Sequence, residues 1–213
     1  MRHAILHQTG LALALLIAAT SVAGQELDTE LTVFGAYRFG GSIAVADSDA
    51  TYEVQDSPSF GLIWNHRHKA NTQWEVYFSQ QQTEVELSDP MLADPIVNID
   101  LYTLQLGGTY LWEGNAVRPY LAMTLGGTHI KSNSINGNSD SDTFISGSIG
   151  LGFKIQPGKR LGLRLEARLN GVLMRDSTKL FCRTGPDLNV CAIELEGDFL
   201  GQLEAIAGVV FRF

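Results

Sequence analysis

The sequence predicts an all-β protein, an eight-stranded antiparallel up-and-down transmembrane β-barrel. Three observations support this fold class. Eight segments alternate between an apolar side chain and a small or polar one, which is the period of a β-strand with two different faces. The connections between these segments alternate between short and long. The last segment is itself such a strand, with phenylalanine at its final position and two positions earlier.

Residues 1–24 predict a secretory signal peptide, so the barrel domain is expected to cover residues 25–213. Arg2 supplies the positive charge, Leu11–Ala19 forms a short apolar core, and small residues around Ala23 provide a cleavage site. No later apolar run approaches the roughly 20 residues that a spanning helix needs. The mature chain is therefore expected to be either a soluble exported protein or a barrel that crosses a membrane with strands.

Each alternating segment separates large apolar side chains from small, polar or charged ones. In residues 73–81, for example, Trp74 and Phe78 share one face, and Glu75 and Ser79 share the other. The eight strands are expected at residues 30–41, 59–66, 73–81, 100–112, 119–131, 143–155, 160–174 and 199–213.

The connections predict how the strands are oriented. Short turns at one end and long polar loops at the other are typical of transmembrane barrels, whose short turns face the periplasm. The short connections are His66–Thr72, Glu113–Arg118 and Gln156–Lys159, the last of which contains the turn signal Pro157-Gly158. The long connections are Ala44–Pro58, Gln82–Ile99, Ser132–Asp142 and Arg175–Asp198.

The apolar face is predicted to be the outer wall of the barrel, in contact with lipid. An eight-stranded barrel has an interior just wide enough to be filled by side chains, and the large apolar residues exceed that space. Aromatic residues gather near both strand ends, such as Trp74 and Trp112 at one and Tyr37 and Tyr102 at the other. Such girdles are typical of the two membrane interfaces. The alternative is a soluble, lipocalin-like barrel with its apolar face inward.

The end of the chain carries a family resemblance. Gly208, Phe211 and Phe213 resemble the C-terminal signature of outer-membrane β-barrel proteins, which the barrel-assembly machinery reads. The pattern over residues 26–213 resembles the small OmpA-like and OmpX/Ail-like barrels. The resemblance implies a place in the Gram-negative outer membrane, with lipid, lipopolysaccharide and the assembly machinery as partners. No periplasmic peptidoglycan-binding domain is expected to follow.

Deletion of Phe213 is expected to impair assembly more than stability. The resemblance implies that the signature is read in the unfolded chain, whereas burial of one lipid-facing phenylalanine contributes only about 1.5–3 kcal/mol. The deletion variant should reach the outer membrane at sharply lower levels, yet refold in detergent almost as well as the wild type. Immunoblots of membrane fractions and refolding yields measure the two effects. Equal surface levels of the two proteins would contradict this prediction.

Charged residues on the inward face predict a plug of salt bridges. Charges within a membrane-embedded segment point to the protein interior and pair with one another. Glu204 is expected to pair with Arg38 and Arg168 on the neighbouring strands, so that its removal destabilises the barrel or increases ion leakage. The alternative is a gate for a narrow, porin-like channel. The six residues of this expected lumen network are Arg38, Glu75, Arg164, Glu166, Arg168 and Glu204.

Cys182 and Cys191 are the only cysteines, and both fall in the last long connection. An even number of cysteines in an exported protein predicts a disulfide. The bond would close a loop of about ten residues, for which chain entropy gives roughly 2.5–3 kcal/mol. Because the barrel is closed by its own hydrogen bonds, the disulfide is expected to order the loop and not the fold.

The remaining features define which functions are expected. The net charge of −8 argues against nucleic acid as a partner. The acidic loops leave divalent cation binding open as an alternative, but they lack an ordered calcium-binding motif, so no metal site is assigned. No cofactor is expected. A third alternative is a lipid A-modifying enzyme, for which His129, followed by Ser132 and Asn133, is the candidate. No catalytic residue is assigned.

The leading expectation is a structural anchor in the outer membrane. Its four surface loops would bind an extracellular ligand, which the sequence does not identify, or would support envelope integrity.

Overall fold

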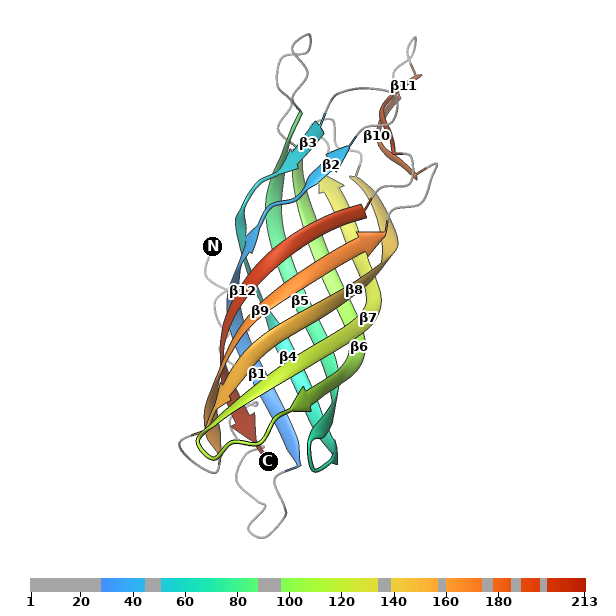
Figure 1. The fold of residues 1–213 in the computed structure, drawn as a ribbon. Helices are drawn as coiled ribbons and strands as arrows, with labels where there is room; N and C mark the ends of the chain where they lie inside the picture. Colours follow the sequence, from blue (N-terminus) through green and yellow to red (C-terminus); the bar gives the residue numbers. More distant parts are fainter. Residues whose placement is uncertain are drawn as a thin grey trace, which may run out of the picture.

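The computed structural model describes residues 28–44, 51–87, 97–133, 139–156, 160–173, 178–184, 189–195 and 199–213. The expected signal peptide lies outside the described residues. Within them the chain forms a closed barrel of eight antiparallel strands, which confirms the predicted fold class (Figure 1). In the described part of the chain, no helix has the length and apolar character needed to cross a membrane.

The eight barrel strands follow one another around the wall in chain order. Each pairs with the strand before it and the strand after it, and the ring closes where β1 pairs with β12. In order around the ring they are β1 (Thr29–Phe39), β4 (Ser57–Lys69), β5 (Thr72–Leu87), β6 (Val97–Leu111), β7 (Val117–Asn133), β8 (Ser139–Ile155), β9 (Leu161–Leu173) and β12 (Phe199–Arg212).

The long connections contain more strand than the sequence indicates. β2 (Ser42–Ala44) pairs with β3 (Thr51–Val54), which pairs with the far end of β5, and β10 (Thr178–Thr184) forms a separate hairpin with β11 (Asn189–Leu195). The expectation that these stretches are plain loops is therefore wrong in part. Outside a membrane both faces of a strand meet water, so backbone pairing continues without the apolar alternation that reveals a strand in the sequence.

The two ends of the barrel differ as the connection lengths predict. The short β4–β5 turn and the C-terminus lie at one end, and β2, β3, β10 and β11 lie at the other (Figure 1). We refer to these as the short-turn end and the long-loop end. From the arrangement typical of transmembrane barrels, the short-turn end is expected to face the periplasm.

The alternation of side chains separates the wall from the lumen. Outward residues form an exposed apolar belt, with Leu125 73% and Leu106 63% exposed, whereas inward Thr124 and Gln105 are buried. The tryptophans Trp64, Trp74 and Trp112 are exposed near the short-turn end. An exposed apolar belt of this extent fits lipid and not water, which argues against the lipocalin-like alternative.

Candidate functional site: the filled lumen

Four buried charges form a closed ring of ion pairs in the lumen, which we call the four-charge cluster. Arg164 lies 3.0 Å from Glu75 and 2.7 Å from Glu166, and Arg168 lies 2.6 Å from each of the same two carboxylates. Arg164, Glu166 and Arg168 are alternate residues of β9 and so share its inward face. Glu75 comes from β5, four strands away in either direction, so its pairs cross the barrel.

Neutral donors complete the hydrogen bonding of this cluster. Asn65 and Thr109 donate to Glu75 Oε2 at 3.0 and 2.6 Å, and Tyr120 donates to Glu166 Oε2 at 2.7 Å. The guanidinium of Arg164 also lies 4.7 Å from the centre of the Tyr120 ring. Buried ions are tolerated only when they are paired and hydrogen-bonded, and this cluster meets both conditions.

A second buried pair joins Arg38 on β1 to Glu204 on β12. Arg38 Nε lies 3.0 Å from Glu204 Oε1. Glu204 also accepts hydrogen bonds from Ser59, Tyr77 and Asn170, at 2.7, 2.7 and 3.1 Å. The Glu204 carboxylate thus accepts hydrogen bonds from one cation, Arg38, and from three neutral donors.

The expected pairing of Glu204 with Arg168 is wrong. The two residues face each other across β12 and β9, yet Arg168 directs its guanidinium to Glu75 and Glu166. Two carboxylates attract this cation more strongly than one that Arg38 already neutralises. Tyr77 connects the Arg38–Glu204 pair to the four-charge cluster. Its hydroxyl donates to Glu204, and its ring centre lies 4.3 Å from the Arg168 guanidinium.

A third charged group at the short-turn end was missed by the sequence reasoning. Lys154 donates to Glu30 and, at 2.7 Å, to Gln73, while Arg212 lies 3.0 Å from Glu30. Lys154 is fully buried. The alternation places Glu30, Lys154 and Arg212 on the inward face, so parity alone could have found them. They were missed because charged residues at strand ends are usually in contact with water.

Apolar side chains fill the rest of the lumen. Phe34, Ile63, Tyr77 and Ile206 pack together beside the ion pairs. Near the long-loop end, six inward residues are apolar and buried, beside buried polar residues such as Gln81 and Thr83. The six apolar residues are Ile99, Leu101, Ile130, Phe144, Val172 and Leu200. We call them the upper apolar layer.

The C-terminal residues have identifiable positions in the barrel. The backbone of Phe213 exchanges hydrogen bonds with Thr29, and Phe211 and Phe213 expose their rings on the outer wall. Gly208 faces the lumen, where an added Cβ would lie 2.8 Å from Thr32 and 2.9 Å from Phe34. Packing therefore accounts for this glycine. Its part in an assembly signal, with the two phenylalanines, stays a prediction.

The cysteines lie opposite each other in the β10–β11 hairpin, where Cys182 pairs in register with Cys191. Directly opposed residues of antiparallel strands have Cα atoms about 4.5–5.5 Å apart, which a disulfide can span. The disulfide itself stays a prediction.

His129, the candidate residue of the enzyme alternative, forms a hydrogen bond between its Nδ1 atom and Thr143 Oγ1 at 2.9 Å. Among the described residues no group of three His, Cys, Asp or Glu side chains could hold a metal ion.

Residues 9–190 match a family model described as an outer membrane protein beta-barrel domain. The chain belongs to this family. It is therefore an outer-membrane β-barrel protein, as the C-terminal resemblance implies. A comparison with curated proteins gives no match.

Solved structures of bacterial surface proteins share the fold. Neisserial surface protein A is 14% identical, with 87% of this chain and 97% of that chain covered and a TM-score of 0.56. The outer membrane protein OprG from Pseudomonas aeruginosa is 12% identical, with 91% and 99% covered and a TM-score of 0.57. At such low identity the likeness shows the fold alone.

Proposed function

We propose that this outer-membrane barrel is a closed, non-conducting anchor whose four long-loop connections act in surface interaction or envelope integrity. The observation that carries the proposal is the four-charge cluster, in which Glu75 on β5 reaches Arg164 and Arg168 on the opposite wall. Lipopolysaccharide, the barrel-assembly machinery and an extracellular ligand are the partners that this role would involve.

The energetics of the cluster favour a plug over a gate. Separating a buried ion from its partner costs about 3–5 kcal/mol, because the remaining charge is left unpaired. Each guanidinium of the cluster contacts two carboxylates, so opening an ion path would break several such pairs at once. A gate that responds to small stimuli needs two arrangements of similar energy, which these contacts do not supply.

The upper apolar layer argues in the same direction. Apolar constrictions in narrow pores exclude water and thereby oppose ion passage. Leu101 and Leu200 in this layer are each only 1% exposed. A porin-like channel, the alternative function, would need a continuous polar path past this layer.

Planar-bilayer recording of the refolded mature protein tests the proposal. The wild type is expected to give no steady conductance across a voltage range in which porins conduct. A Glu84→Gln variant, altered at an exposed outward residue of β5, is the matched control and should behave identically. Steady single-channel conductance of the wild type would favour the narrow-channel alternative and contradict the anchor.

A further inference from the structure

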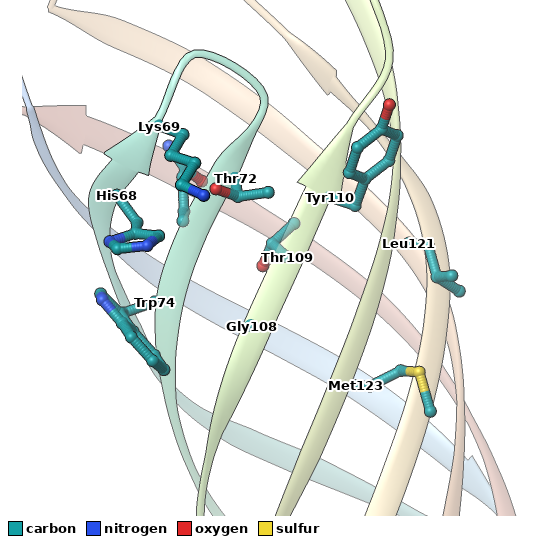
Figure 2. Close-up of a pocket in the computed structure, with 10 residues that line it drawn as sticks. His68, Lys69, Thr72, Trp74, Gly108, Thr109, Tyr110, Leu121 and Met123 are labelled. Carbon is teal, nitrogen blue, oxygen red and sulfur yellow. The ribbon is translucent and has the colours of Figure 1, made fainter.

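A groove of about 390 Å³ lies on the outer wall at the short-turn end, over β5, β6 and β7 (Figure 2). Its apolar part is lined by Trp74, Gly108, Tyr110 and Met123, and its polar end by Lys69, the last residue of β4, and Thr72, the first residue of β5. We propose that this groove binds one anionic glycerophospholipid of the periplasmic leaflet. Its phosphate would lie at the polar end, and one acyl chain would follow the apolar part.

A glycine forms the floor of the apolar part. Gly108 lies in register between Trp74 on β5 and Met123 on β7, and it faces outward as they do. Trp74 and Met123 are 57% and 58% exposed, so they stand on either side of a position without a side chain. An added Cβ at Gly108 would approach only the Gln73 carbonyl oxygen, at 3.3 Å. A furrow one side chain wide in an apolar wall suits a hydrocarbon chain.

The polar end offers a cation without a counterion. Near the end of β4, Arg67 is paired with Asp28 at 3.1 Å, and the His68 ring lies 5.4 Å from the Trp74 ring. Lys69 is exposed, and within the described residues no carboxylate lies at ion-pair distance from it. Its ammonium group is therefore free to meet an anion at the membrane surface.

A buried hydroxyl lies beside this cation. Thr72 Oγ1 is buried yet has no hydrogen-bond partner among the described residues. Figure 2 shows Lys69 and Thr72 next to each other at the same end of the groove. A buried polar atom without a partner costs free energy, which a ligand oxygen would relieve. An ammonium and a hydroxyl together suit a phosphate oxygen.

The position of the groove identifies the source of that phosphate. Trp74 and Tyr110 belong to the aromatic girdle at the short-turn end, where rings lie at headgroup level. The groove continues from this level into the apolar belt, so one molecule with a phosphate and an acyl chain occupies both parts. A zwitterionic headgroup would add a second positive charge near Lys69. An anionic glycerophospholipid avoids that repulsion.

Native mass spectrometry of the refolded mature protein, mixed with phosphatidylglycerol or phosphatidylcholine, tests the inference. The wild type is expected to retain one phosphatidylglycerol in preference to phosphatidylcholine. Lys69→Gln and Thr72→Val, which alter the polar end, and Gly108→Leu, which fills the furrow, should each weaken retention by about tenfold. A shift in gel mobility between heated and unheated samples reports whether each variant is folded.

The controls lie elsewhere on the outer wall. Lys131→Gln removes an exposed lysine near the long-loop end, and Gly35→Leu fills an outward glycine position that has nothing within 4 Å. Both should retain phosphatidylglycerol like the wild type. Equal retention of the two lipids by the wild type would overturn the site. So would folded Lys69→Gln and Thr72→Val variants that match the controls, even if Gly108→Leu fails to fold.

Discussion

The Glu75→Ala variant should be less stable than the wild type by about 3–5 kcal/mol. Glu75 accepts hydrogen bonds from two guanidinium groups, those of Arg164 and Arg168, and from Asn65 and Thr109. Without it, both arginines face Glu166 alone, and their side chains are fully buried. The variant leaves one buried positive charge uncompensated and a cavity beside it.

Urea unfolding in lipid vesicles, followed by tryptophan fluorescence, measures this loss. Glu204→Ala should cost less than Glu75→Ala, because Glu204 pairs with one arginine and three neutral donors. The exposed Glu84 supplies the control, and Glu84→Gln should unfold like the wild type. A Glu75→Ala barrel that unfolds together with the Glu84→Gln control would contradict the plug.

The Gly107→Ala variant is expected to lose about 1–3 kcal/mol, the usual range for overpacking, or to fail to close. An added Cβ at Gly107 would lie 1.9 Å from the Met123 carbonyl oxygen and 2.7 Å from the Thr124 Cα atom. Both are backbone atoms of β7, so relief requires one strand to move against its ladder of hydrogen bonds. The close approach of the two strands therefore requires glycine.

Gly35→Ala is the matched control for this change. A Cβ at Gly35 on β1 would meet nothing within 4 Å. Each variant adds one methyl group to a strand glycine. The general effect of replacing a strand glycine therefore cancels when the stabilities of the two variants are compared. The same urea unfolding experiment distinguishes them. Equal urea midpoints for Gly107→Ala and Gly35→Ala would contradict the prediction, because they would show that β7 can shift to accommodate the added methyl group at little cost in stability.

The outer wall could be predicted because lipid imposes a strict rule on it. Each strand that crosses the membrane must place residues such as Trp74 and Phe78 outward, so alternation alone locates the eight strands. Outside the lipid no such constraint acts, so the sequences of strands such as β3 and β10 lack the regular alternation of apolar and polar residues. Their pairing follows from backbone hydrogen bonds that any polar sequence can make.

The lumen could be predicted in its composition but not in its pairings. Parity places Glu75, Arg168 and Glu204 inward, yet it does not indicate which side chains meet across the barrel. That depends on strand tilt and stagger, which set the level at which opposite strands face each other. Arg168 thus pairs with Glu75 on the opposite wall and not with Glu204 on the adjacent strand. The groove at Gly108 depends likewise on neighbours from three strands.

The edge shared by β1 and β12 carries an ion pair near each end. Glu30 lies opposite Arg212, and Arg38 lies opposite Glu204. A slip of one residue would turn every side chain of the strand to the wrong face, and a slip of two would keep the faces but separate both pairs.

These two strands stand at opposite ends of the barrel sequence, so their contact has the greatest loop-closure cost and is expected to form last. Until then both edges are open to pairing with other chains. The two ion pairs therefore select the correct register at the final step of folding, when a mismatched closure would trap unpaired charges inside the barrel.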